Sequence, residues 1–111
     1  MMRTGPSPVV RGVVMVRDAG RCQRCGGIGH QIQHRLARGS GGTSKPNINL
    51  LSNLVLLCAH CHDWVERRER KQAEQDGWWV RHGLELPSEV PMRRVDGSRF
   101  FLTDEGTVVP I

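Results

Sequence analysis

The chain carries four cysteines at a spacing that suits zinc. They form two C-x2-C pairs, Cys22 with Cys25 and Cys58 with Cys61. Each pair places two thiolates on one tight turn, and two such turns complete the tetrahedral ligand set of a structural zinc ion. Such a site has no open coordination position, so we expect the zinc to stabilise the fold and not to touch a substrate.

Histidines beside the second cysteine pair offer a further kind of chemistry. His60 and His62 flank Cys61, and either has the chemistry to replace a cysteine as a zinc ligand, although four thiolates make this unnecessary. His62 would then stand at the start of a predicted helix, with Glu66 four residues later on the same face. An imidazole and a carboxylate in this arrangement can bind a second cation that prefers oxygen ligands.

Composition and charge limit the class of protein. The chain has 111 residues, of which 38% are hydrophobic and 5% aromatic, so it forms one domain with a thin core that needs an additional staple such as zinc. Its net charge is +5, with 14 arginines and 2 lysines. Arginine binds phosphate well and a polyanionic partner is favoured, although plain solubility and a GC-rich genome would explain the same numbers.

The N-terminal sequence bears on the compartment. MMRTGPSPVV lacks the apolar core of a signal peptide, and no stretch of the chain has the length of apolar sequence that a membrane span needs. These features predict a cytoplasmic protein with no membrane contact. Thiols stay reduced in the cytoplasm, which favours metal ligation over disulfides.

The residues between and after the cysteine pairs predict the elements that position these side chains. Residues 28–34 alternate between isoleucine or histidine and glycine or glutamine, as a short strand does. A Gly-rich loop follows, and then residues 53–58 (NLVLLC) form the compact apolar run of a buried strand. Residues 62–77 fit a helix that ends at Gly77. The predicted order is strand, loop, strand, helix.

The two flanking regions differ from this centre. Residues 1–8 are rich in glycine and proline and are predicted to form a flexible arm, whereas residues 9–20 fit a short helix or, equally, a strand. Residues 78–111 hold turn sequences between β-prone runs and are predicted as a β-rich extension. Trp78 and Trp79 would pack this extension onto the central region, residues 9–77.

The motifs together resemble a known family. The order C-x2-C, QHRLARGSGG and NLVLLCAHCH resembles the HNH endonucleases, in particular the small zinc-knuckle type common in bacteriophage genomes, over residues 9 to about 80. His34 precedes the Gly-rich loop as in that family, and Asn53 stands nine positions ahead of His62. The resemblance implies a small α+β protein with a ββα-metal core, in which two strands and a helix surround one divalent cation.

The same resemblance assigns roles to three residues. His34 would be the general base, because an imidazole with its ordinary pKa near 6.5 can take a proton from water at physiological pH. Asn53 would tie the loop to the following strand, since its amide donates and accepts hydrogen bonds at once; an ordinary turn or cap asparagine is the alternative. His62 would bind the catalytic cation, which stabilises charge on the phosphate as a Lewis acid.

Gln33 departs from the family pattern. Many members carry His or Asp directly before the general base, where it is a second metal ligand, and an amide oxygen is a weaker ligand. The predicted cation site therefore consists of His62, Gln33 and Glu66, and it would take Mg2+, Mn2+, Ni2+ or Zn2+. Either Glu66 or a backbone carbonyl compensates for Gln33, or catalysis has been lost.

These observations lead to one main hypothesis and two alternatives. The first is an endonuclease that hydrolyses phosphodiester bonds in double-stranded DNA, with Arg35 and Arg38 either on flanking phosphates or simply solvated. By resemblance, the protein would be encoded by a phage and act in the host cytoplasm. It would be linked to the terminase that packages DNA. The alternatives are a zinc-stabilised DNA-binding or adaptor protein without turnover, and a zinc protein that binds another protein through Trp78, Trp79 and the β-rich tail.

Overall fold

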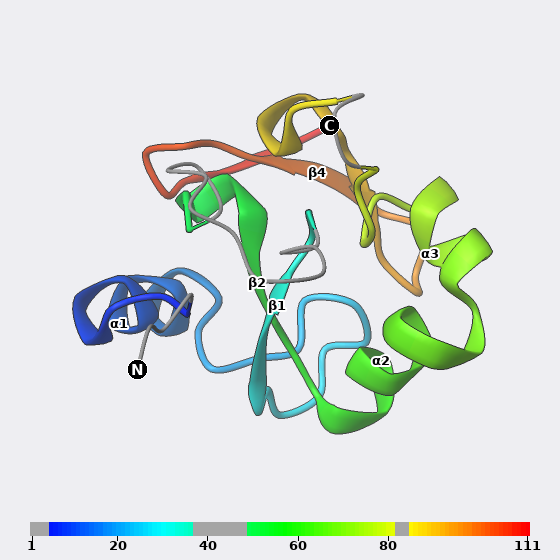
Figure 1. The fold of residues 1–111 in the computed structure, drawn as a ribbon, viewed down its shortest axis with the longest axis horizontal. Helices are drawn as coiled ribbons and strands as arrows, with labels where there is room; N and C mark the ends of the chain where they lie inside the picture. Colours follow the sequence, from blue (N-terminus) through cyan, green and yellow to red (C-terminus); the bar gives the residue numbers. More distant parts are fainter. Residues whose placement is uncertain (1–4, 37–48, 82–84) are drawn as a thin grey trace.

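The computed structural model describes residues 5–36, 49–81 and 85–111, which form an α+β structure as predicted (Figure 1). The elements are α1 (Pro8–Arg17), β1 (Gln31–His34), a 3-10 turn (Leu51–Asn53), β2 (Leu54–Leu57), α2 (Ala59–Asp63), a π turn (Trp64–Arg68), α3 (Arg70–Gln75), a second 3-10 turn (Pro87–Glu89), β3 (Met92–Arg93), β4 (Arg99–Leu102) and β5 (Val108–Pro110). The predicted order of strand, loop, strand and helix thus describes β1 to α3, although the loop itself, residues 37–48, lies outside the described residues.

The strands β1 and β2 form an antiparallel pair. Gln31 lies opposite Leu57, and His34 lies opposite Leu54. The first strand is shorter than the predicted residues 28–34, because Ile28 pairs instead with Arg21 in an isolated bridge. His34 is therefore the last residue of β1 and lies beside the start of β2.

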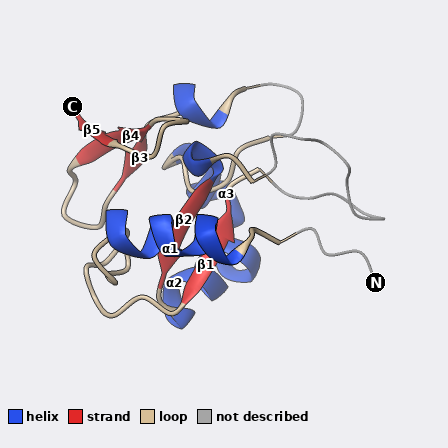
Figure 2. Cartoon of the chain, turned by 90° about the vertical axis from the view of Figure 1, so that its left-hand side faces the viewer, coloured by secondary structure: helices blue, strands red, loops and turns tan. Residues whose placement is uncertain are grey.

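All four residues of β2 are buried because both faces of the strand are covered. Leu54 and Leu56 pack with Val14 of α1 on one face. Val55 and Leu57 face the main core, together with Cys61, Val65, Ala73, Trp78, Met92, Phe100 and Leu102. Figure 2 shows α1 crossing the front of the β1–β2 pair, with α2 and α3 behind it. The continuous apolar run of this segment reflects burial on both sides.

Residues 8–17 are helical, which decides between the two alternatives for this region. The hydroxyl oxygen of Ser7 accepts a hydrogen bond from the Val10 backbone N–H, and Pro8 occupies the first turn, where a missing N–H costs nothing. The predicted arm over residues 1–8 is therefore too long at its C-terminal end, and residues 1–4 lie outside the described part. Val14 is buried, while Val9 and Val16 are exposed.

The helix predicted over residues 62–77 is three shorter segments. The first begins at Ala59, where the Cys58 Sγ accepts a hydrogen bond from the Cys61 N–H as a cap. A π turn follows, closed by a bond from the Glu69 N–H to the Trp64 carbonyl, and Glu69 itself leaves helical geometry at φ −133°. The uniform helical pattern of the sequence carried no signal for this break.

The C-terminal extension is β-rich, as predicted, and shares the main core. Its strands form one antiparallel sheet in the order β3-β4-β5. Trp78 is fully buried, meets the Phe100 ring edge-on at 6.1 Å and donates from Nε1 to the Arg93 carbonyl. Trp78 is therefore not available to bind another protein, whereas Trp79 is half-buried. Gly77 allows the close approach, since a Cβ there would lie 1.9 Å from the Pro91 carbonyl oxygen.

Arg35 connects the end of β1 to this extension. Its side chain is fully buried and donates to four backbone carbonyls, those of Ser52, Gly77, Pro87 and Val90. Burial lowers the pKa of Arg35, and the charge of Arg17 adds to this effect. The prediction that Arg35 contacts DNA phosphate is therefore wrong, because its guanidinium is buried and hydrogen bonded to backbone carbonyls.

No helix among the described residues is both long enough and apolar enough to cross a membrane.

Replacing Arg35 is expected to destabilise the protein strongly. Arg35→Met would leave four buried carbonyls without their donor, and the free energy of unfolding should fall by roughly 3 kcal/mol or more, measured by urea denaturation of the zinc-loaded protein. Arg81, which is 63% exposed and paired with Glu74, provides the matched control, because Arg81→Met should change stability by no more than about 0.5 kcal/mol. Equal effects of the two substitutions would contradict this account of Arg35.

Candidate functional site

The four cysteines converge in the structure. Their Sγ atoms all lie within 4.8 Å of one another, and those of Cys25 and Cys58 are 3.8 Å apart. A tetrahedron of sulfurs around zinc, with Zn–S bonds of about 2.3 Å, has edges of about 3.8 Å. The donor set and its spacing fit a structural zinc ion. Among the described residues, this is the only cluster of three or more His, Cys, Asp or Glu side chains placed to hold a metal.

The surroundings of two of these thiols shift their pKa values in opposite directions. Burial of Cys22 disfavours its thiolate, but backbone N–H groups, that of Cys25 first, outweigh burial and lower the pKa of Cys22 to about 7. Burial raises the pKa of Cys61, and the hydrogen bond from Arg24 opposes that rise only in part. The cluster therefore needs a cation to hold all four sulfurs as thiolates together.

Arg24, which the sequence reasoning missed, supplies part of that positive charge. Its Nη1 donates to the Cys61 Sγ at 3.3 Å, and its guanidinium lies 3.6 Å from the centre of the Trp64 ring. The side chain thus joins the cluster to the π turn after α2. Its position inside the first C-x2-C pair was visible in the sequence, but nothing there showed which way it points.

His34 lies at the end of β1 and contacts a residue that the sequence did not single out. Its Nε2 is 2.8 Å from the Asn49 Oδ1, while the Asn49 Nδ2 donates to the Gly5 carbonyl at 3.3 Å. Since the Asn49 amide nitrogen faces a carbonyl, its oxygen faces the imidazole and can accept from Nε2 in the tautomer that carries the proton there. In neutral His34 the lone pair is then on Nδ1. Asn49 thus contacts the His34 side chain directly. From the sequence, Asn53 was the asparagine expected to position the loop after His34.

Asn53 makes the tie that was predicted for it. Its Oδ1 accepts from the Leu36 N–H at 2.7 Å, and its Nδ2 lies 3.5 Å from the Leu36 carbonyl. Its own carbonyl accepts from the Arg35 N–H at 2.9 Å. The buried Asn53 therefore fixes the chain directly after His34 against the start of β2.

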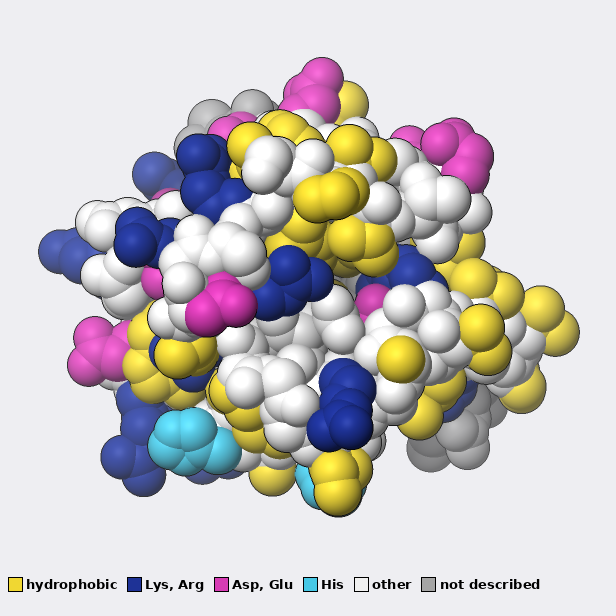
Figure 3. Space-filling view, turned by 180° about the vertical axis from the view of Figure 1, so that it is seen from behind, with side chains coloured by type: hydrophobic (Ala, Val, Ile, Leu, Met, Phe, Trp, Pro, Cys, Tyr) yellow, Lys and Arg dark blue, Asp and Glu magenta, His cyan; other side chains and the backbone are white. Residues whose placement is uncertain are grey.

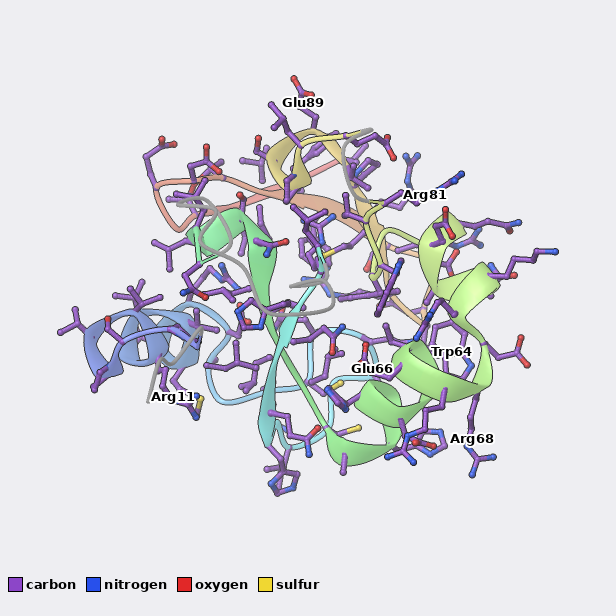
Figure 4. The ribbon with its side chains drawn as sticks, in the orientation of Figure 1. Arg11, Trp64, Glu66, Arg68, Arg81 and Glu89 are labelled. Carbon is purple, nitrogen blue, oxygen red and sulfur yellow. The ribbon has the colours of Figure 1, made fainter. Side chains whose placement is uncertain are left out.

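Gln33 and Glu66 are in contact across β1 and the π turn. The Gln33 Nε2 donates to the Glu66 Oε2 at 3.3 Å and to the His34 carbonyl at 3.0 Å. Figure 4 shows Glu66 pointing from the helical segment toward β1, whereas Arg68 points away. The two residues are brought together as a cation site would require, but the amide nitrogen of Gln33 faces the carboxylate, and a nitrogen of this kind is not a metal ligand.

His62 lies in α2, four residues after Cys58 and half-buried. Of the three ligands predicted for a catalytic cation, His62 and Glu66 carry an imidazole and a carboxylate, and Gln33 turns its amide nitrogen toward Glu66. The other predicted phosphate contact, Arg38, lies outside the described residues.

Comparisons with models of protein families, with curated proteins and with solved structures found no match to this chain.

Loss of one thiolate should remove the metal. We expect Cys61→Ser to lower the zinc content from about one ion per chain to almost none and to unfold the protein, because zinc binding by such clusters contributes about 10 kcal/mol or more. Elemental analysis and circular dichroism measure the two effects. His60→Ala is the control: His60 is exposed beside Cys61 and should not change the zinc content. Zinc loss in His60→Ala would mean that a histidine, and not four thiolates, completes the site.

Proposed function

We propose that this protein is a metal-dependent endonuclease of the HNH kind that hydrolyses phosphodiester bonds in double-stranded DNA. The observation that carries the proposal is the Asn53 side chain, whose amide is bonded at both ends to Leu36. This tie fixes the chain directly after His34 against the start of β2, and β2 leads through Cys58 directly to His62. The motif that resembles the family is thus supported by a physical link between its histidine, asparagine and histidine segments.

In this proposal His34 activates the attacking water. With the proton held on Nε2 by Asn49, the neutral imidazole takes the proton of water at Nδ1. The backbone on both sides of the base is restrained, because the Arg35 N–H is bonded to Asn53 and the Arg35 side chain is anchored in the core. A fixed base of this kind lowers the entropic cost of reaching the reacting geometry.

His62 and Glu66 are the residues that would hold the divalent cation, Mg2+, Mn2+, Ni2+ or Zn2+. A cation bound there would supply Lewis-acid stabilisation of the charge that develops on the scissile phosphate. The four-cysteine site is separate from this chemistry, because its sulfurs fill a tetrahedral coordination shell.

The net positive charge of the protein supports DNA as the substrate. This charge is distributed over the surface of the described residues and does not form a single basic stripe there. The net charge is +5, and Arg67, Arg68 and Arg70 are exposed on the π turn and α3. Arg67 and Arg68 share Asp63 as an ion-pair partner, so only part of their charge is neutralised. On the face seen in Figure 3, arginine and lysine side chains are spread widely. Association with a phage terminase in a host cytoplasm remains a proposal from the resemblance.

Gln33 favours a second candidate, a zinc-stabilised DNA-binding or adaptor protein without turnover. With its amide nitrogen toward Glu66, Gln33 presents a hydrogen-bond donor where the family carries a metal ligand. The two candidates differ in whether His34 and His62 are needed for a measurable reaction.

Plasmid cleavage separates the two candidates. The zinc-loaded protein should convert supercoiled plasmid to open-circle or linear DNA in Mg2+, Mn2+ or Ni2+ but not in excess EDTA, as followed on agarose gels. His34→Ala and His62→Ala should each reduce the rate at least 100-fold, because they remove the base and a cation ligand. His30→Ala, which changes an exposed histidine just before β1, should cleave like the unchanged protein. Metal-independent or absent cleavage by the folded protein would reject the endonuclease.

Asn49 should control the base through its tautomer. Asn49→Ala removes the acceptor for Nε2, and we expect cleavage to slow by roughly tenfold to a hundredfold without loss of fold. Asn49→Asp keeps an acceptor but places a carboxylate beside the imidazole, which favours its protonated form. The acidic limb of the pH–rate profile should then move up by about one pH unit, since His34 loses its proton only at higher pH. Identical profiles for Asn49→Asp and the unchanged protein would show that Asn49 does not act on His34.

A further inference from the structure

The side chain of Gln33 has an unusual position for a residue next to a candidate cation site. It is only 2% exposed, in the middle of the contact between β1 and the π turn. Its amide nitrogen reaches two oxygens, the His34 carbonyl at 3.0 Å and the Glu66 Oε2 at 3.3 Å. Both partners accept hydrogen bonds and neither donates one.

The identity of these partners fixes the orientation of the amide. Only the nitrogen of a glutamine side chain carries hydrogens, so only the nitrogen can satisfy a carbonyl and a carboxylate together. Turning the amide over would place its oxygen against two other oxygens in a buried position, which is costly. The ligand role that the sequence suggested for Gln33 requires that turned orientation.

Glu66 lies in an irregular segment of the chain. It belongs to the π turn, whose wider spacing changes where its side chains point compared with a regular helix. The same turn is attached to the cysteine cluster at Trp64, on which Arg24 stacks at 3.6 Å. Gln33 is the described side chain of β1 that hydrogen bonds to the Glu66 carboxylate from the strand side.

We propose that Gln33 is a positioning residue for Glu66 and not a metal ligand: it holds the Glu66 carboxylate against β1, beside His34, where that carboxylate binds a divalent cation together with His62. This inference rests on the proposed function for the existence of the cation site. In this inference, the metal ligand that the family carries at position 33 is replaced by a hydrogen-bond donor, which acts on the ligand Glu66.

A double-mutant cycle on Mn2+ affinity tests the inference. Isothermal titration calorimetry would measure Mn2+ binding to the zinc-loaded protein and to Gln33→Met, Glu66→Ala and the double variant. Methionine fills a similar volume without a donor. We expect Gln33→Met to weaken binding about tenfold and Glu66→Ala at least tenfold. The double variant should bind no more weakly than Glu66→Ala alone, because Gln33 acts only through Glu66.

Additive losses would overturn the inference, since they mean that Gln33 contributes to the cation by itself. Unchanged affinity in Gln33→Met, or no Mn2+ binding by the unchanged protein, would overturn it as well. Gln31→Met, at an exposed position of the same strand, is the matched control and should leave the affinity unchanged. Circular dichroism establishes that each variant is folded before titration.

Plasmid cleavage by the same samples keeps this inference distinct from the proposed function. A non-additive cycle in a protein that never cleaves DNA would support the role of Gln33 and reject the endonuclease. Cleavage with an additive cycle would support the endonuclease and reject this role of Gln33.

Discussion

Four thiol groups within 4.8 Å of one another cannot all be ionised unless a cation neutralises them, and much of the structure is arranged around this constraint. The cluster joins the segment before β1 to the segment after β2. Cys58 contributes a sulfur to the cluster and also caps α2, so the cluster determines where the helix begins and, with it, the place of His62. Arg24 extends the same link to the π turn through Trp64. A chain with few aromatic residues thereby obtains order that its apolar core alone would not give.

The parts that the sequence predicted well are those set by local patterns. Alternation marked the strand that ends at His34, an unbroken apolar run marked β2, and the spacing of the cysteine pairs marked a cluster that the structure brings together. The turn sequences predicted within residues 78–111 likewise include one that separates two strands that pair with each other, β3 and β4. In each case the signal lies within a few residues, and no distant partner is needed to interpret it.

The parts that the sequence did not predict depend on distant partners. Arg35 was expected on a DNA phosphate or in solvent, yet its acceptors lie 17 to 55 residues further along the chain. Asn49 was not singled out in the sequence, and only folding brings it to His34. Gln33 could be placed beside Glu66 from the motif, but the direction of its amide follows from what surrounds it. A residue type shows which bonds a side chain can make, whereas the tertiary structure decides which of them it does make.

The anchoring of Arg35 also has a consequence for how the chain reaches its native state. Its acceptors at Pro87 and Val90 belong to the C-terminal extension, as do Met92, Phe100 and Leu102 of the main core. During synthesis, the strand that carries His34 therefore leaves the ribosome long before the residues that complete its surroundings. Contacts between such distant segments slow folding, because long loops must close before the contacts form. Until then Arg35 would stay hydrated, and the central segment would acquire its final arrangement only when almost the whole chain has been made.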